Sequence, residues 1–110
     1  MSSAVPFVTS LRARRATIHM GADGEPTITI RVEMEAVWDA IRIEVPPSAS
    51  VVAVKKRALE ALFPEAEYHE DFVAKLGGWE ILNEYESLSA AGVKDGSILL
   101  LMHRRRRPLR

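Results

Sequence analysis

The sequence predicts an α+β fold with its elements in the order β-β-α-β-β-β. Three observations carry this prediction. Apolar and polar residues alternate over residues 27–35 and again over 38–45, which is typical of half-buried strands. Apolar residues then recur at helical spacing over residues 51–63. A final apolar run at residues 98–103 has the length of a strand and no polar alternation, which favours a central position in the sheet.

The first two strands are expected to form a hairpin. About two residues, Ala36 and Val37, separate "TITIRVEME" from "WDAIRIEV", so the turn between them is tight and the strands are antiparallel. The turn type stays open because neither Asn-Gly nor Asp-Gly is present. The buried face of this hairpin is predicted to consist of Ile28, Ile30, Val32, Met34, Ile41, Ile43 and Val45.

A single amphipathic helix follows. "PPSAS" ends the second strand, and Ser50 can cap the helix "VVAVKKRALEALF". Its apolar face is predicted to hold Val51, Val54, Ala58, Leu59 and Leu62. Lys55 lies inside this apolar stripe, where its ammonium either extends to solvent or forms a buried ion pair.

Three shorter strands are predicted after the helix. "FVAKL" and "WEIL" flank a Gly-Gly turn, and "ILLLMH" closes the sheet behind a helical turn and an Asp-Gly turn. The register of "FVAKL" has two solutions, with either Phe72, Ala74 and Leu76 or Val73 and Lys75 facing the core. We prefer the first, which places Val73 on the outer face.

The two ends of the chain carry its positive charge. Residues 23–95 contain all fifteen acidic residues and only seven basic ones, a net charge of −8, while eight arginines lie outside this range. We expect residues 1–26 to form a mostly disordered extension, 27–104 the folded domain, and 105–110 a basic tail. The extension also has weak features of a mitochondrial transit peptide, and translation from Met20 is an alternative.

The sequence offers no catalytic or metal-binding pattern. There is no cysteine, which excludes disulfides and thiolate chemistry and fits a cytoplasmic location. The acidic segment "EAEYHED" lacks the ligand spacing of a metal site, and the three histidines have no partner at a diagnostic distance along the chain. We therefore expect no enzyme activity, no cofactor, no metal and no small-molecule substrate.

Three segments resemble the ubiquitin-like family. These are "TITIRVEME" as its first strand, "IEVPPSASVVAVKKRAL" as its second strand, bend and helix, and "SLSAAGVKDGSILLLMHR" as its Leu-Ser turn and last strand. The resemblance implies a ubiquitin-like β-grasp, a mixed sheet packed on one helix. It also implies an ion pair between Lys55 and an acid before the Leu-Ser turn, for which Glu84 is the first choice. "LSAAGVKDG" is most similar to small bacterial ubiquitin-like proteins associated with type VII secretion.

One departure from the family bears on activity. Conjugated ubiquitin-like modifiers and sulfur carriers end in Gly-Gly, whereas here the last strand is followed by Arg104, Arg105, Arg106 and Arg107. Gly77-Gly78 lies inside a predicted hairpin and cannot take that role. We therefore expect neither conjugation nor sulfur transfer.

A protein-binding surface is expected on the sheet face opposite the helix. Leu100 and Met102 should point outward there, together with Trp38 at the hairpin tip and Val73 on the neighbouring strand. Alternatively, the N-terminal extension covers this patch or Trp38 packs on its own hairpin. Trp79 is expected to be a local packing residue.

The basic tail has several possible roles. The acidic domain repels polyanions, so we expect first a tail that is solvated or bound to its own domain. A contact with a protein partner is the second alternative, and binding to nucleic acid or a membrane is the third. The function predicted is a non-catalytic protein-interaction module, which the resemblance places in a bacterial secretion or other multiprotein assembly. The alternative is a small nucleic-acid-binding protein that uses its basic ends.

Overall fold

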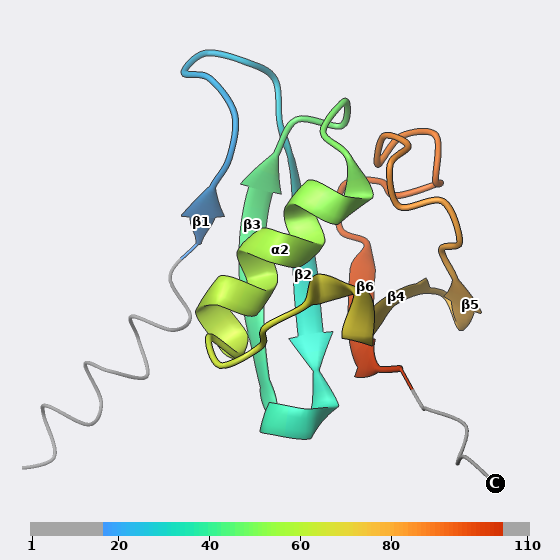
Figure 1. Ribbon diagram of the computed structural model, residues 1–110. Coiled ribbons are helices and arrows are strands. Elements are labelled where there is room, and N and C mark those ends of the chain that lie inside the picture. The colour runs from blue at the N-terminus through green and yellow to red at the C-terminus, as the bar shows by residue number, and fades with distance from the viewer. Residues whose placement is uncertain (1–16, 105–110) are drawn as a thin grey trace, which may run out of the picture.

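The computed structural model describes residues 17–104 of the 110-residue chain. Within this range one α-helix, α2 (Val51–Leu62), packs across one face of a six-stranded mixed sheet (Figure 1). Across the sheet the strands lie in the order β1-β3-β2-β6-β4-β5. Their bounds are β1 (Ile18–His19), β2 (Ile28–Met34), β3 (Asp39–Val45), β4 (Phe72–Leu76), β5 (Trp79–Glu80) and β6 (Ile98–His103).

The predicted element order is confirmed, and β6 takes the central position that its composition indicates. It pairs in parallel with β2, with Val32 opposite Leu99, and antiparallel with β4, with Ala74 opposite Leu101. Leu99 and Leu101 are buried beneath α2 together with the inward residues of β2 and β3. The core thus forms between the helix and one face of the sheet, and the other face has no helix over it within residues 17–104.

The β2–β3 connection differs from a two-residue hairpin turn. Glu35–Val37 forms a short 3-10 helix, η1, and Trp38 follows with φ of 53°, in the left-handed region. The Trp38 amide donates to Glu35 O at 3.0 Å, which closes this turn. Strand β3 therefore starts at Asp39, and Trp38 lies at the tip of the hairpin.

The N-terminal boundary of the domain lies earlier than residue 27. Ile18 and His19 pair in parallel with β3, opposite Ile43 and Glu44, and the Met20 amide donates to Glu44 O at 2.8 Å. Ile18 and Met20 pack against the edge of the core, which stabilises this added strand. Gly21 is needed in the turn that follows, since its φ is 100° and a Cβ there would come within 2.5 Å of the Pro46 ring. Residues 18–20 of the predicted extension thus pair with the sheet.

The register of β4 follows the preferred solution, but Val73 is not exposed. Phe72 and Ala74 face the core, and Val73 lies on the outer face opposite Met102 with only 7% of its surface accessible. Arg104, at the end of β6, reaches across β4 on this face to form an ion pair with Glu80 of β5. We attribute the burial of Val73 to Met102 and to this Arg104 side chain.

The region after β4 contains less regular structure than predicted. Strand β5 comprises Trp79 and Glu80 alone, and the predicted "WEIL" strand ends there, although the Ile81 amide still donates to Ala74 O at 2.8 Å. A second 3-10 helix, η2 (His69–Asp71), leads into β4. Residues 83–97 form successive turns that return the chain to β6.

The start of α2 gives a direct test of the local analysis. Ser50 Oγ accepts a hydrogen bond from the Ala53 amide at 3.1 Å, as an N-cap does. Replacing Ser50 with Ala should lower the free energy of unfolding by about 1 kcal/mol in urea denaturation. Ser48→Ala is the matched control, because Ser48 lies in the preceding turn and its hydroxyl has no partner within residues 17–104. Equal effects of the two substitutions would contradict the capping role of Ser50.

Candidate protein-interaction site

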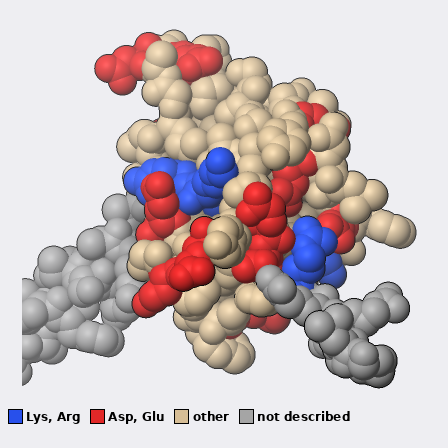
Figure 2. Space-filling view, viewed as in Figure 1, with Lys and Arg blue, Asp and Glu red and all other residues tan. Residues whose placement is uncertain are grey.

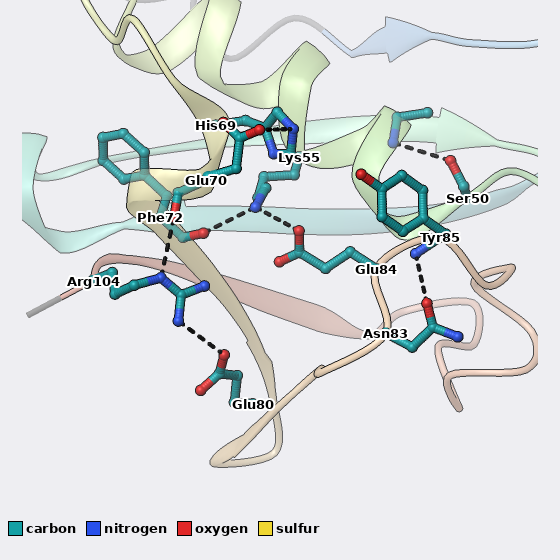
Figure 3. Close-up of polar contacts among 11 residues, drawn as sticks. Ser50, Lys55, His69, Glu70, Phe72, Glu80, Asn83, Glu84, Tyr85 and Arg104 are labelled. Atoms are coloured by element: carbon teal, nitrogen blue, oxygen red, sulfur yellow. Dashed lines mark hydrogen bonds and ion pairs between the residues drawn. The ribbon is translucent and has the colours of Figure 1, made fainter.

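A buried bridge connects the helix, the sheet and the loop before β6. Lys55 is 2% exposed, and its Nζ donates to Phe72 O at 2.9 Å and to Glu84 Oε1 at 2.5 Å (Figure 3). Of the two sequence alternatives for Lys55, the structure therefore has the buried ion pair, with Glu84 as the carboxylate partner. The Val52 amide also donates to Glu84 O at 2.7 Å, so the helix contacts residue 84 through both backbone and side chain.

The stability of this bridge depends on both charges being present. Replacing Glu84 with Ala should lower the free energy of unfolding by about 3 kcal/mol, because it leaves a buried ammonium without its counter-charge. The double variant Lys55→Met/Glu84→Gln should be more stable than Glu84→Ala, because it removes both charges. Chemical denaturation measures both effects.

Glu86→Ala is the control for the bridge. Its carboxylate makes no hydrogen bond or ion pair within residues 17–104, and the substitution should change the unfolding free energy by less than about 0.5 kcal/mol. A double variant as unstable as Glu84→Ala would show that Lys55 and Glu84 are not energetically coupled.

The outer face of β6 presents a stripe of apolar side chains. Leu99 and Leu101 point into the core, so Ile98, Leu100 and Met102 lie on the opposite face. Ile98 is 50% exposed, and Leu100 and Met102 are half-buried. We call these three residues the β6 stripe.

Charged residues lie on both sides of the β6 stripe. In register with Leu100 are Glu33 of β2 on one side and Lys75 of β4 on the other, while Arg31 is opposite Ile98. The outer face is thus an apolar line on a central strand between polar neighbours. This composition differs from a broad apolar patch.

Trp38 is the most exposed of the predicted site residues, with 90% of its surface accessible. It lies at the hairpin tip and lines an open groove of about 580 Å³ on the outer side of β2 and β3. The alternative that Trp38 packs on its own hairpin therefore does not hold in this structure. Val73, the fourth residue predicted for the patch, is buried and does not contribute accessible surface.

The exposure of one aromatic residue and one aliphatic residue differs from the sequence prediction. Trp79, expected to pack locally, is 80% exposed on the edge strand β5. Ile98 is more exposed than either Leu100 or Met102 but was not among the residues predicted for the patch, and the outward parity of β6 is the signal that could have identified it. Tyr68, Leu82 and Tyr85 are also largely exposed.

Arg104 is fixed at the end of β6. Its amide donates to Asp71 O at 2.6 Å, its Nε donates to Glu70 O at 3.1 Å, and its Nη1 lies 3.6 Å from Glu80 Oε2. Strand β6 itself ends at His103, and the bond from the Arg104 amide continues its backbone pairing by one residue. Arg105, Arg106 and Arg107 lie outside the described residues.

The described part of the chain contains no cluster of side chains suited to metal binding. Within residues 17–104 no three His, Asp or Glu side chains converge to hold a metal ion. His69, in the acidic loop, has Nε2 3.4 Å from Glu70 Oε2, and its Nδ1 is buried without a hydrogen-bond partner in this range. None of the helices in residues 17–104 is long and apolar enough to cross a membrane.

Comparison with known proteins identifies the fold. No protein-family model matches the sequence, and no curated protein matches it. Among solved structures, the ubiquitin-like domain of an Arabidopsis thaliana protein aligns with a TM-score of 0.62 at 15% identity, covering 84% of this chain and 93% of that one. The ubiquitin of Caldiarchaeum subterraneum aligns with a TM-score of 0.60 at 22% identity, covering 76% and 100%.

A third match is the ubiquitin-like domain of Plasmodium falciparum Dsk2, with a TM-score of 0.57 at 23% identity, covering 71% of this chain and 99% of that one. Together with the sheet order and the single packed helix, these matches define the class of protein. The chain has a ubiquitin-like β-grasp fold.

Proposed function

We propose that this chain is a non-catalytic protein-interaction module that binds its partner through the β6 stripe. The observation that carries the proposal is the placement of Ile98, Leu100 and Met102 on the open face of a central strand. A central strand whose role was only structural would need apolar residues on its helix side alone. Trp38 lies beside the same face and can extend the contact.

We also propose that the chain is not conjugated to other molecules. The residues that follow β6 are arginines, and Gly77-Gly78 forms the β4–β5 turn with φ of 59° and 87°. A diglycine in a hairpin between paired strands cannot enter an activating enzyme as an extended terminus. The module thus acts by reversible binding.

The setting of the module is a further part of the proposal. We place it in the cytoplasm, as an accessory component of a bacterial secretion or other multiprotein assembly. The support is the likeness of "LSAAGVKDG" to the small proteins associated with type VII secretion, together with the absence of cysteine from the sequence. Secretion ATPase or membrane-protein genes next to its own gene would support this setting, and RNA-processing genes there would count against it.

The β6 stripe can be tested before the binding partner is identified. Proteins that bind the immobilised wild-type chain should not bind the Leu100→Ser/Met102→Ser variant. They should still bind Leu82→Ser, the control, because Leu82 is also an exposed apolar residue but lies on a different part of the surface. The affinity of a purified partner should fall about tenfold or more, as at interface hot spots. Quantitative mass spectrometry followed by calorimetric titration measures both effects.

The fold of the double variant is the control for this test. Leu100 and Met102 are half-buried and lie outside the main core, so the unfolding free energy should fall by less than about 2 kcal/mol. If the double variant is unfolded, the two residues are part of the core and the proposal fails. It also fails if Leu82→Ser abolishes the same interactions.

The alternative function, nucleic-acid binding, depends on the basic ends. Figure 2 shows that acidic side chains are spread over the helix side of the domain, with basic ones confined to small areas. A phosphate backbone would be repelled by this surface. We therefore expect only weak RNA or DNA binding at about 150 mM salt, measured by fluorescence anisotropy with labelled oligonucleotides.

Deletion of residues 105–110 separates the two functions. The melting temperature should stay nearly unchanged, since surface ion pairs contribute about 0–1 kcal/mol each. Submicromolar nucleic-acid binding that this deletion removes would favour the alternative. Partner binding retained by the deletion and lost with Leu100→Ser/Met102→Ser would favour the β6 stripe.

A further inference from the structure

The groove beside Trp38 has a definite pattern of side chains. It lies on the outer side of the β2–β3 hairpin, where Arg31 pairs in register with Arg42, and Glu33 with Ala40. Glu35 and Trp38 form its end at the hairpin tip. The groove therefore runs along the hairpin from an acidic, aromatic end at the tip to an arginine end further along the strands.

The two charged ends of the groove are free within the described chain. The side chains of Glu35 and Arg42 are exposed and form no ion pair with any residue in the range 17–104. Arg31 and Glu33 differ from them, because Arg31 Nε lies 2.7 Å from Glu33 Oε2 and the two charges neutralise each other. The unsatisfied charges are thus one negative, Glu35 at the tip, and one positive, Arg42, which lies opposite Arg31 at the other end of the groove.

Between these charges lie a large and a small apolar residue. Trp38 is held away from the hairpin by its left-handed backbone, with most of its ring in solvent. Ala40, the next outward residue, leaves the floor of the groove low. A non-glycine residue in this backbone conformation costs about 1 kcal/mol or more. The hairpin therefore holds Trp38 in its exposed position despite local backbone strain.

We propose that the occupant of this groove is a second copy of the same chain. Two hairpins that pack face to face and antiparallel place the tip of each copy, with Glu35 and Trp38, over the arginine end of the other, with Arg42. Trp38 of each copy then enters the groove of the other, above Ala40 and against the guanidinium of Arg42, where a cation–π contact is favourable. Glu33 lies near the two-fold axis, and its pairing with Arg31 removes the repulsion that two carboxylates would have there.

Self-complementarity favours a second copy over other occupants. A two-fold interface requires that residue i contacts residue j while j contacts i. The acidic, aromatic end and the arginine end, on either side of the central Glu33–Ala40 pair, meet this requirement. A nucleic acid is disfavoured because the groove has more carboxylates than guanidinium groups: Glu33, Glu35 and Asp39 line it against Arg31 and Arg42. A different protein would need to reproduce the same order of side chains in reverse.

This self-association goes beyond the proposed function and does not rest on it. The groove lies over β2 and β3, whereas the β6 stripe lies on the next strand of the sheet. The test uses the purified full-length chain alone, so its result is independent of whether a partner binds the stripe.

Sedimentation velocity of the full-length chain over a concentration series tests the proposal. The wild type should show a monomer–dimer equilibrium, and Trp38→Ala should weaken the dimer about tenfold or more, as expected for a buried interface tryptophan. Trp79→Ala is the matched control, because Trp79 is also exposed but lies on the edge strand β5, which β6 and β4 separate from the hairpin. Trp79→Ala should dimerise like the wild type.

Charge-swap variants test the antiparallel arrangement of the two hairpins. Glu35→Arg and Arg42→Glu should each be mainly monomeric alone, since each copy would face like charges. An equimolar mixture of the two should form a heterodimer, because both Glu35–Arg42 contacts are restored with their signs exchanged. The control Lys56→Glu, on the exposed side of α2, should not affect dimerisation.

The outcomes that overturn the proposal are specific. A wild type that stays monomeric up to millimolar concentration would leave the groove to a different protein. A dimer that Trp79→Ala weakens as much as Trp38→Ala would place the interface elsewhere. A mixture of the charge-swap variants that associates no more than each variant alone would exclude the antiparallel pairing.

Discussion

The ammonium of Lys55 is the constraint on which the rest of the structure depends. A charged group buried this deeply is tolerated only when its hydrogen bonds are satisfied, and both of its acceptors come from segments distant in the sequence. Phe72 O belongs to the first residue of β4, and Glu84 belongs to the loop between β5 and β6. Any shift of α2 along the sheet, or of the loop away from the helix, would leave the ammonium unpaired. The bridge therefore selects one arrangement of helix, sheet and loop.

The outer face of the sheet follows from that arrangement. When Phe72 and Ala74 are directed toward α2, strand alternation places Val73 and Lys75 on the outer face, beside β6. The same alternation in β6 turns Leu99 and Leu101 inward and leaves the β6 stripe outside. The two proposed contact surfaces lie on this one face and use different strands, so self-association through the hairpin and partner binding through β6 can influence each other. Their charged neighbours make both contacts sensitive to salt.

Much of the fold could be predicted because its signals are local. Alternation predicted β2 and β3, and helical periodicity predicted α2. The apolar stripe of the helix left two alternatives for Lys55, and the family resemblance favoured the buried ion pair. The remaining features depend on contacts that a local pattern does not contain. Two residues are too few for β1 to show alternation, and we attribute the burial of Val73 to side chains from other segments, Met102 and Arg104. Trp79 is apolar enough to suggest burial, yet β5 lies at the sheet edge, where little covers it. The sequence predicted which strand carries the candidate site and which of its residues face outward. It did not predict the groove, because the groove depends on the left-handed backbone conformation of Trp38.

Native-state hydrogen exchange tests the role of the Lys55 bridge most directly. The amides of Val52 and Leu88, which bond to Glu84 O and Ala49 O, report on the contact between the helix and the loop, and the amides of β6 report on the sheet. In the wild type, both groups should exchange through global unfolding, with the same free energy of opening. In Lys55→Met, the free energy of opening for Val52 and Leu88 should fall below that of β6, because the loop can then detach from an intact sheet. Equal protection of the two groups in Lys55→Met would contradict the account, since the loop would then be held in place without the bridge.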